Sequence, residues 1–144
     1  MKKTDIKILL VDDEPDILEI VGYNLSNEGY SVFTAKNGVK AIEQAKKIKP
    51  HLILLDVMMP EMDGIEACEK IRGLDGLNDV LIAFFTARGE DYSQVAGFEA
   101  GADDYITKPV KPKVLVSKVK SLLRRLKTAT DENIVTVGSI VINR

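Results

Sequence analysis

Short apolar runs alternate with longer amphipathic stretches along most of this chain. Each apolar run ends at a turn or at a charged residue, which is typical of a strand that is buried on both faces. The amphipathic stretches repeat their apolar positions every three or four residues, as a helix does when one side packs on a core. The runs predict strands at residues 6–11, 30–34, 52–55, 80–85 and 104–107. The amphipathic stretches predict helices at residues 15–27, 39–49, 64–73, 90–100 and 112–127.

Strands that alternate with helices in this way predict an α/β fold, in which helices cover both faces of a parallel sheet. We expect residues 1–127 to form this domain and the polar stretch 128–132 to be a linker. Residues 133–144 alternate apolar and polar side chains, which predicts one or two antiparallel strands. Since an isolated hairpin is only marginally stable in water, we expect this segment to begin a further domain or to dock on another surface.

Composition excludes several classes of protein. The 144 residues are 45% hydrophobic and 29% charged, as in an ordinary globular protein, and a net charge of −2 gives no general attraction to nucleic acid or membranes. Cys68 is the only cysteine and His51 the only histidine, which excludes an internal disulfide and argues against a zinc site or a Cys–His pair. No apolar run reaches the roughly 18 residues of a membrane span, and the N-terminus lacks the apolar core of a signal peptide. We therefore expect a cytoplasmic protein.

The expected strand ends bring chemically active side chains to one place. Asp12 and Asp13 follow the first strand, Asp56 the third, Thr86 the fourth and Lys108 the fifth. The C-terminal ends of parallel strands meet at the edge of the sheet where open α/β folds bind their ligands. Clustered carboxylates repel one another unless a cation lies among them, and Mg²⁺ favours such oxygen ligands and bridges to phosphate. With a lysine and a hydroxyl group beside an acceptor carboxylate, the set has the parts needed for phosphoryl transfer.

Each of these residues also has an ordinary structural explanation. Acidic side chains stabilise helix N-termini, threonine can end a strand, and Lys-Pro can form a turn. Five such coincidences at matching strand ends are less expected than one functional site, so we favour the site.

Four motifs resemble the receiver domain of two-component response regulators, in the order and spacing of that family, between about residues 6 and 127. The motifs are Val11-Asp12-Asp13-Glu14-Pro15, the stretch 54–64 from Leu54 to Asp63-Gly64, Thr86-Ala87-Arg88, and the stretch 101–109 from Gly101 to Lys108-Pro109. The resemblance implies a flavodoxin-like (βα)5 fold, which is a doubly wound parallel sheet of strand order 2-1-3-4-5.

The resemblance also implies a role for the acidic residues. Asp56 would be the phosphoacceptor, and it would receive the phosphoryl group from the phosphohistidine of a sensor histidine kinase. Mg²⁺ would be held by Asp13, Asp56 and the main-chain carbonyl of Met58, with Asp12 contributing through a water molecule.

A conformational switch is implied as well. Lys108 would bind the phosphoryl group, Thr86 would move towards it, and Tyr105 would turn inward behind Thr86. The Lys108–Pro109 peptide bond would be cis. Phosphorylation would then favour one of two arrangements of the fourth helix, the fifth strand and the fifth helix.

The motifs around Arg88-Gly89-Glu90 and Leu122 to Arg125 resemble the OmpR/PhoB branch in particular. In that branch the receiver precedes a winged-helix DNA-binding domain that opens with a small antiparallel sheet, and residues 133–143 resemble this opening. A recognition helix is absent, so we expect DNA binding only through a C-terminal domain that this chain lacks. Either the chain is truncated or the natural protein ends at Arg144.

The branch further implies a homodimer that phosphorylation promotes, formed across the fourth helix, the fifth strand and the fifth helix. Lys118 replaces the usual arginine of one intersubunit pair and loses its two-pronged hydrogen bonding. Gln94 and Val114 replace both members of another pair, so no charge is left unpaired. An ordinary solvated helix face is the alternative. The expected dimer face contains Gln94, Asp103, Asp104, Val114, Lys118 and Arg125, with Asp104 facing Lys118 and Asp103 facing Arg125 of the second copy.

The alternatives to a phosphorylation-switched signalling domain are a phosphatase and a constitutive binding module. An aspartyl-phosphate phosphatase would carry a second aspartate two residues after its nucleophile, where this chain has Met58. A constitutive binding module would be expected to lose one member of the acidic, threonine and lysine set, which is complete here. We therefore expect no enzyme activity beyond slow removal of the domain's own phosphoryl group.

Overall fold

The computed structural model describes residues 3–87, 100–108 and 111–135, and for residues 3, 86, 87 and 126–135 it describes the backbone only. The chain divides into two compact units, Met1–Pro112 and Lys113–Arg144, and each is described by itself. Among the described helices, none is both long enough and apolar enough to cross a membrane.

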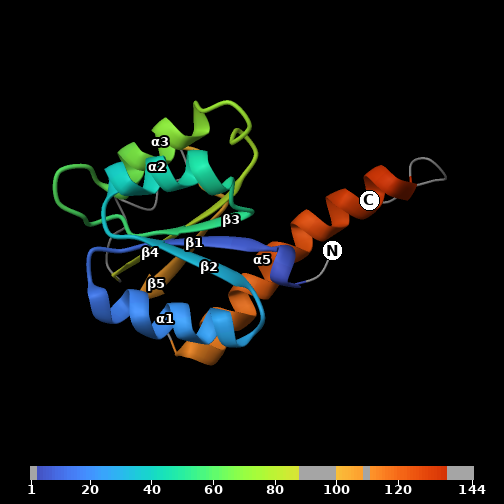
Figure 1. Cartoon of the computed structure of the whole chain (residues 1–144), viewed down its shortest axis with the longest axis horizontal. Helices are drawn as coiled ribbons and strands as arrows, with labels where there is room; N and C mark the ends of the chain where they lie inside the picture. Colours follow the sequence, from blue (N-terminus) through green and yellow to red (C-terminus); the bar gives the residue numbers. More distant parts are fainter. Residues whose placement is uncertain (1–2, 88–99, 109–110, 136–144) are drawn as a thin grey trace. The chain divides into compact units, whose positions relative to one another are not determined.

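Five parallel strands form the central sheet of the first unit (Figure 1). They are β1 (Lys7–Val11), β2 (Ser31–Ala35), β3 (Leu52–Leu55), β4 (Leu81–Ala87) and β5 (Asp104–Lys108). Their hydrogen-bonded order is β2-β1-β3-β4-β5, which confirms the predicted fold class and strand order. Because β1 and β3 are neighbours at the centre of the sheet, their C-terminal ends lie side by side.

Helices lie on both faces of this sheet. A 3-10 turn (Lys3–Asp5) precedes β1, helix α1 (Pro15–Asn27) lies on one face, and α2 (Gly38–Ile48) and α3 (Gly64–Arg72) lie together on the other (Figure 1). The starts of α2 and α3 follow from their sequences, since Asn37 accepts a hydrogen bond from the Lys40 N–H and Asp63 one from the Glu66 N–H. These three helices agree with the predicted ones to within one residue at each end.

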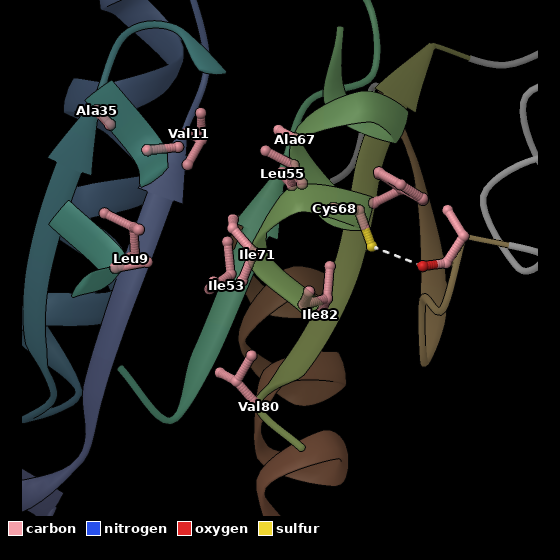
Figure 2. Close-up of a cluster of buried hydrophobic side chains, with 14 of the residues drawn as sticks. Leu9, Val11, Ala35, Ile53, Leu55, Ala67, Cys68, Ile71, Val80 and Ile82 are labelled. Atoms are coloured by element: carbon pink, nitrogen blue, oxygen red, sulfur yellow. Dashed lines mark hydrogen bonds between the residues drawn. The ribbon is translucent and has the colours of Figure 1, made fainter. Parts of the chain in front are cut away.

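The strands read as continuous hydrophobic runs because residues 8–11 and 52–55 are buried on both faces of the sheet, and α2 and α3 cover the apolar core on one of these faces. Alternate residues of β1 and β3, such as Leu9 and Ile53, point into this core and have no exposed surface. Figure 2 shows Ile53 and Leu55 of β3 beside Ala67 and Ile71 of α3, and Leu9 belongs to the same buried cluster. The thiol of Cys68 lies 3.6 Å from the carbonyl oxygen of Ala100, and burial raises the pKa of this thiol to about 11. Cys68 is therefore a packed core residue.

The second unit contains α5 (Pro112–Val135), and its length differs from the prediction. The helix continues past residue 127 through the stretch 128–132 that was expected to be a linker, and residues 133–135, expected to be extended, are helical. The stretch contains no proline or glycine before Gly138, so nothing in its backbone chemistry ends the helix at residue 127. The predicted helix 90–100 and the remaining strand residues 136–143 lie outside the described residues, apart from Ala100, which is in a turn.

Candidate functional site

Asp12 and Asp56 lie next to each other at the C-terminal edge of the sheet. The last paired residues of their strands are Val11 and Leu55, so each aspartate is the first residue beyond its strand. Both backbones continue the ladder, since Asp56 N–H donates to the Val11 carbonyl at 3.0 Å and Asp12 N–H to the Ala35 carbonyl at 3.1 Å. Asp12 is fully buried and Asp56 is 4% exposed. The sheet therefore holds two carboxylates rigidly in a place with little water.

Asp13 completes an acidic cluster with these two residues. One carboxylate oxygen from each of Asp12, Asp13 and Asp56 lies within 4.8 Å of the others, and Asp13 is the exposed member. Burial raises the pKa of Asp56 to about 7, and the charges of Asp12 and Asp13 act in the same direction. The Lys108 ammonium group and a hydrogen bond from the Met58 N–H offset part of this rise. The cluster thus carries more negative charge than its surroundings can stabilise, which is the condition that a bound cation relieves.

Lys108, the last residue of β5, places its ammonium group against the acidic cluster. Its Nζ lies 2.7 Å from Asp12 Oδ2, 3.5 Å from Glu14 Oε1 and 3.8 Å from Asp56 Oδ2. It also lies 5.1 Å from the centre of the Phe85 ring. Burial alone would lower the pKa of Lys108, but the hydrogen bond to Asp12 and the nearby carboxylates outweigh it and raise the pKa. Lys108 therefore remains protonated and carries a positive charge in the site.

Glu14 is a site residue that sequence reasoning missed. It was assigned only to the start of α1, where acidic residues are common, yet its carboxylate lies 3.5 Å from the Lys108 ammonium group. Its backbone N–H also donates to Asp12 Oδ1 at 2.9 Å, which fixes the orientation of that carboxylate. Its position directly after Asp12-Asp13 was the available signal, because a third acid there extends the same cluster.

The loop after β3 depends on Gly64 in a way that sequence reasoning also missed. Gly64 N–H donates to the Val57 carbonyl at 2.9 Å, so the first residue of α3 is bonded to the backbone beside Asp56. A Cβ atom at Gly64 would lie 2.1 Å from the Asp56 carbonyl oxygen. The sequence placed Gly64 only at the start of the predicted helix 64–73, whereas the glycine is what allows α3 to approach the acidic residue so closely. Met58 donates its N–H to Asp56 Oδ1 at 3.3 Å and leaves its side chain 60% exposed.

The residues of the cluster fit a magnesium ion. Carboxylate oxygens are the ligands that Mg²⁺ prefers, and the ion needs only a few of them because it keeps several waters. Asp12, Asp13 and Asp56 offer such oxygens from two adjacent strand ends, within 4.8 Å of one another.

Of the two expected switch residues, the structure describes the side chain of Tyr105 but not that of Thr86. Thr86 pairs with Thr107 in the β4–β5 ladder, and its side chain lies outside the described residues. Tyr105 pairs with Phe84, and their rings meet edge to face with centres 6.4 Å apart. Tyr105 is half-buried and packs against the core cluster, on the same strand as Lys108.

Asp103, expected on the dimer face, has a partner within its own chain. Its Oδ2 lies 2.9 Å from Arg72 Nη2 and accepts the N–H of Ile82 at 2.9 Å. Arg72 also donates twice to the Gly101 carbonyl, at 3.0 and 2.6 Å, and to the carbonyls of Asn78 and Val80. The guanidinium group ties the end of α3 to the segment just before β5.

The other expected dimer-face residues are described in part. Gln94 lies outside the described residues. Asp104 accepts a hydrogen bond from the N–H of Tyr105 at 2.7 Å. In the second unit, α5 exposes Val114 to 49% and also exposes Lys118 and Arg125.

Comparison with known proteins places these observations in a family. A family model described as the response regulator receiver domain matches residues 8–120, which is most of the chain. The chain is 46% identical to the alkaline phosphatase synthesis transcriptional regulatory protein PhoP of Bacillus subtilis, over 85% of this chain and 50% of that protein. It is also 46% identical to the transcriptional regulatory protein ResD of Bacillus subtilis, over 84% of this chain and 49% of that protein. The chain therefore spans about half the length of these relatives.

Solved structures agree with this similarity. A CheY-like response regulator receiver domain protein from Methanospirillum hungatei matches with a TM-score of 0.81 and 31% sequence identity, over 86% of this chain and 98% of that one. The chemotaxis protein CheY4 of Vibrio cholerae matches with a TM-score of 0.79 and 30% identity, over 82% and 98% of the two chains.

Proposed function

This chain belongs to the response regulator receiver family of two-component systems, in its OmpR/PhoB-like branch, and on this premise we propose that Asp56 is its phosphoacceptor. The phosphoryl group would come from the phosphohistidine of a sensor histidine kinase in the cytoplasm. The observation that carries the proposal is the setting of Asp56, a buried carboxylate beside two further aspartates and the Lys108 ammonium group.

The proposed transfer needs Asp56 as a nucleophile. An oxygen of its carboxylate attacks phosphorus, the new O–P bond forms as the P–N bond of the phosphohistidine breaks, and the released imidazole nitrogen takes up a proton. The product is an acyl phosphate. The attacking carboxylate must be ionised, and its pKa of about 7 in the metal-free site means that a cation would help to keep it so near neutral pH.

We propose that Mg²⁺ occupies the acidic cluster. Asp13, Asp56 and the main-chain carbonyl of Met58 would hold the ion, and Asp12 would contribute through a water molecule. A bound Mg²⁺ would offset the charges of the carboxylates and of the incoming phosphoryl oxygens. The close approach of the three carboxylates supports this assignment.

Lys108 would bind the transferred phosphoryl group. Its ammonium group is 3.8 Å from Asp56 Oδ2 and is held by Asp12 and Glu14, so only a small displacement separates it from a group on Asp56. A lysine suits this role because its ammonium group is a mobile point charge that can follow the phosphoryl oxygens. Thr86 would donate its hydroxyl to the same group, and Tyr105 would turn inward behind it.

The output of this switch would be transcriptional. The relatives PhoP and ResD are named as transcriptional regulatory proteins, and a further relative from Synechocystis, 39% identical, is named as a DNA-binding master regulator. We propose that phosphorylation promotes a homodimer and controls DNA binding through a C-terminal domain. Val114, which is 49% exposed on α5, would be the apolar centre of the dimer face, with Gln94, Asp104, Lys118 and Arg125 around it. Asp103 is less suited to that face than expected, because Arg72 of the same chain binds its carboxylate.

The phosphoacceptor assignment is tested with a small-molecule phosphodonor. The protein is incubated with acetyl phosphate and Mg²⁺, and its intact mass is measured beside that of Asp56→Asn and of a control in EDTA. We expect one added phosphoryl group in the wild type with Mg²⁺, and none in the variant or in EDTA.

The same measurement separates the alternatives. A folded wild-type protein that gains no phosphoryl group would support a constitutive binding module. Rapid turnover of the donor without accumulation of the phosphorylated protein would support a phosphatase, although Met58 stands where such an enzyme carries its second aspartate.

A further inference from the structure

A hollow of about 440 Å³ lies at the free edge of the sheet, and the proposed phosphorylation site does not use it. β2 is an edge strand that pairs only with β1 within the described sheet. The hollow is lined by Leu18 of α1, by Thr34 and Ala35 at the end of β2, and by one side of α2. None of the three clustered aspartates lines it.

Three lysines give this hollow a positive charge. Lys40 and Lys47 lie one above the other on α2, seven residues apart, and Lys36 enters from the connection between β2 and α2. Glu43 is the one acid in the lining, and it lies 3.6 Å from Lys40. Residues 36–49 contain five lysines and one glutamate in a chain whose net charge is −2, so the positive charge is concentrated here. Such a cluster attracts anions against the sign of the whole molecule.

The remaining lining groups suit an organic anion. Leu18 and Ala35 are the apolar residues of the lining, and Thr34 and Gln44 are its neutral polar residues. Gln44 Nε2 lies 3.4 Å from the Thr34 carbonyl oxygen, which is a long hydrogen bond that a ligand can replace. Ligand sites typically combine a mainly apolar lining with a few polar groups in a volume of about 300–1,000 Å³.

A small ligand fits these observations better than an added peptide strand. Strand addition requires a row of unpaired backbone groups along the edge. Here the hollow reaches only the end of β2, and Gln44 already contacts the Thr34 carbonyl. We propose that this hollow binds a small organic phosphate with two or more anionic groups, which the three lysines hold while Leu18 and Ala35 contact its apolar part.

The alternative is that these lysines only protect the edge strand. Lysine side chains at a sheet edge prevent pairing with other chains, and this role needs no ligand. The two explanations differ in whether anions bind at a defined place and in a saturable way.

Inorganic pyrophosphate is the probe for the test. It is titrated into ¹⁵N-labelled protein in EDTA at constant ionic strength, and backbone amide shifts are followed by NMR. We expect saturable shifts at Lys36, Lys40, Gln44 and Lys47, with a Kd of about 1 mM or tighter. Inorganic phosphate should bind more weakly, because it cannot engage all three lysines.

A pair of double variants provides the matched control. Lys40→Gln with Lys47→Gln removes two charges from the hollow, and Lys46→Gln with Lys49→Gln removes two charges from exposed positions outside it. The first pair should weaken pyrophosphate binding at least tenfold, and the second less than twofold. Equal weakening by both pairs would mean a diffuse basic surface and would overturn the proposal. The absence of saturable shifts in the wild type would also overturn the proposal. In that case, increased self-association of the Lys40→Gln, Lys47→Gln variant would show that the lysines protect the edge strand.

Discussion

Gly64 lies so close to Asp56 that a Cβ atom at position 64 would stand 2.1 Å from the Asp56 carbonyl oxygen. The contact is with backbone on both sides, so neither partner can move away by changing a side-chain rotamer. The loop that carries the proposed phosphoacceptor can therefore adopt this conformation only because residue 64 is a glycine and has no Cβ atom.

We expect Gly64→Ala to lower the free energy of unfolding by about 2 kcal/mol or more, because a tightly packed site must distort to accept the added carbon. It should also slow phosphorylation by acetyl phosphate, since Asp56 moves with the loop. Gly73→Ala is the control, because Gly73 ends α3 with a φ of −84° and its nearest neighbour would be 3.6 Å from the new Cβ. Urea unfolding measures both variants, and equal effects would contradict the proposed role of Gly64.

The pKa of Asp56 predicts how the metal-free protein responds to pH. Its folded-state pKa of about 7 lies above its ordinary value of 3.8, so the folded protein holds this proton more tightly than the unfolded chain does. The stability that this group contributes is therefore complete below about pH 4 and is lost as the pH rises through about 7. Asp56→Asn removes the penalty, and we expect it to stabilise the protein in EDTA by about 1–4 kcal/mol at pH 8.

The same substitution should have little effect at pH 4.5, where Asp56 is largely protonated in the folded state. Urea unfolding at the two pH values measures the difference. Asp75→Asn is a control, since Asp75 is exposed and follows α3 away from the acidic cluster. A stabilisation by Asp56→Asn that is the same at both pH values would show that the buried charge of Asp56 is not its cause.

The Arg72–Asp103 pair predicts a large loss of stability on substitution. Arg72 serves four acceptors from two segments of the chain, and its side chain is only 18% exposed. We expect Arg72→Met to lower the free energy of unfolding by about 2–4 kcal/mol, because it leaves half-buried acceptors without a donor. Lys70→Met, on the exposed side of the same helix, should change it by about 0.5 kcal/mol or less, since its partner Glu66 is also exposed.

A double-mutant cycle with Asp103→Asn isolates the ion pair. We expect a coupling energy of about 1–2 kcal/mol between Arg72 and Asp103. A coupling near zero would leave Asp103 available to a second copy of the chain, as its expected place on the dimer face required.

The proposed dimer face predicts a specific effect of Val114→Glu. Val114 is 49% exposed, and a glutamate there would place a charge in the apolar centre of the face. We expect this variant to abolish the association that phosphorylation promotes, as measured by sedimentation of the acetyl phosphate-treated protein. Val39→Glu is the control, because Val39 is 46% exposed on α2 and should leave association unchanged. Unchanged association of Val114→Glu would exclude this face.

The sequence by itself determined the fold class and most of the site. Local patterns depend on only a few neighbouring residues, so they can be recognised from the sequence alone. They include apolar runs, amphipathic spacing and capping residues such as Asn37 and Asp63. Since the C-terminal ends of parallel strands lie at one edge of the sheet, the same pattern predicted that Asp12, Asp56 and Lys108 lie close together. The end of α5 was misjudged because polar residues were taken as a linker, although nothing in the stretch 128–132 prevents a helix.

Only the tertiary structure decided which groups these residues contact. Lys108 meets Glu14 across 94 positions of sequence, Arg72 meets Gly101 across 29, and Gly64 touches the backbone of Asp56 through the packing of α3 on β3. Such contacts depend on how helices and strands pack against one another, and local sequence patterns do not predict this packing. The lysine-lined hollow at the end of β2 belongs to the same class, because its walls come from α1, β2 and α2 and exist only when these have packed.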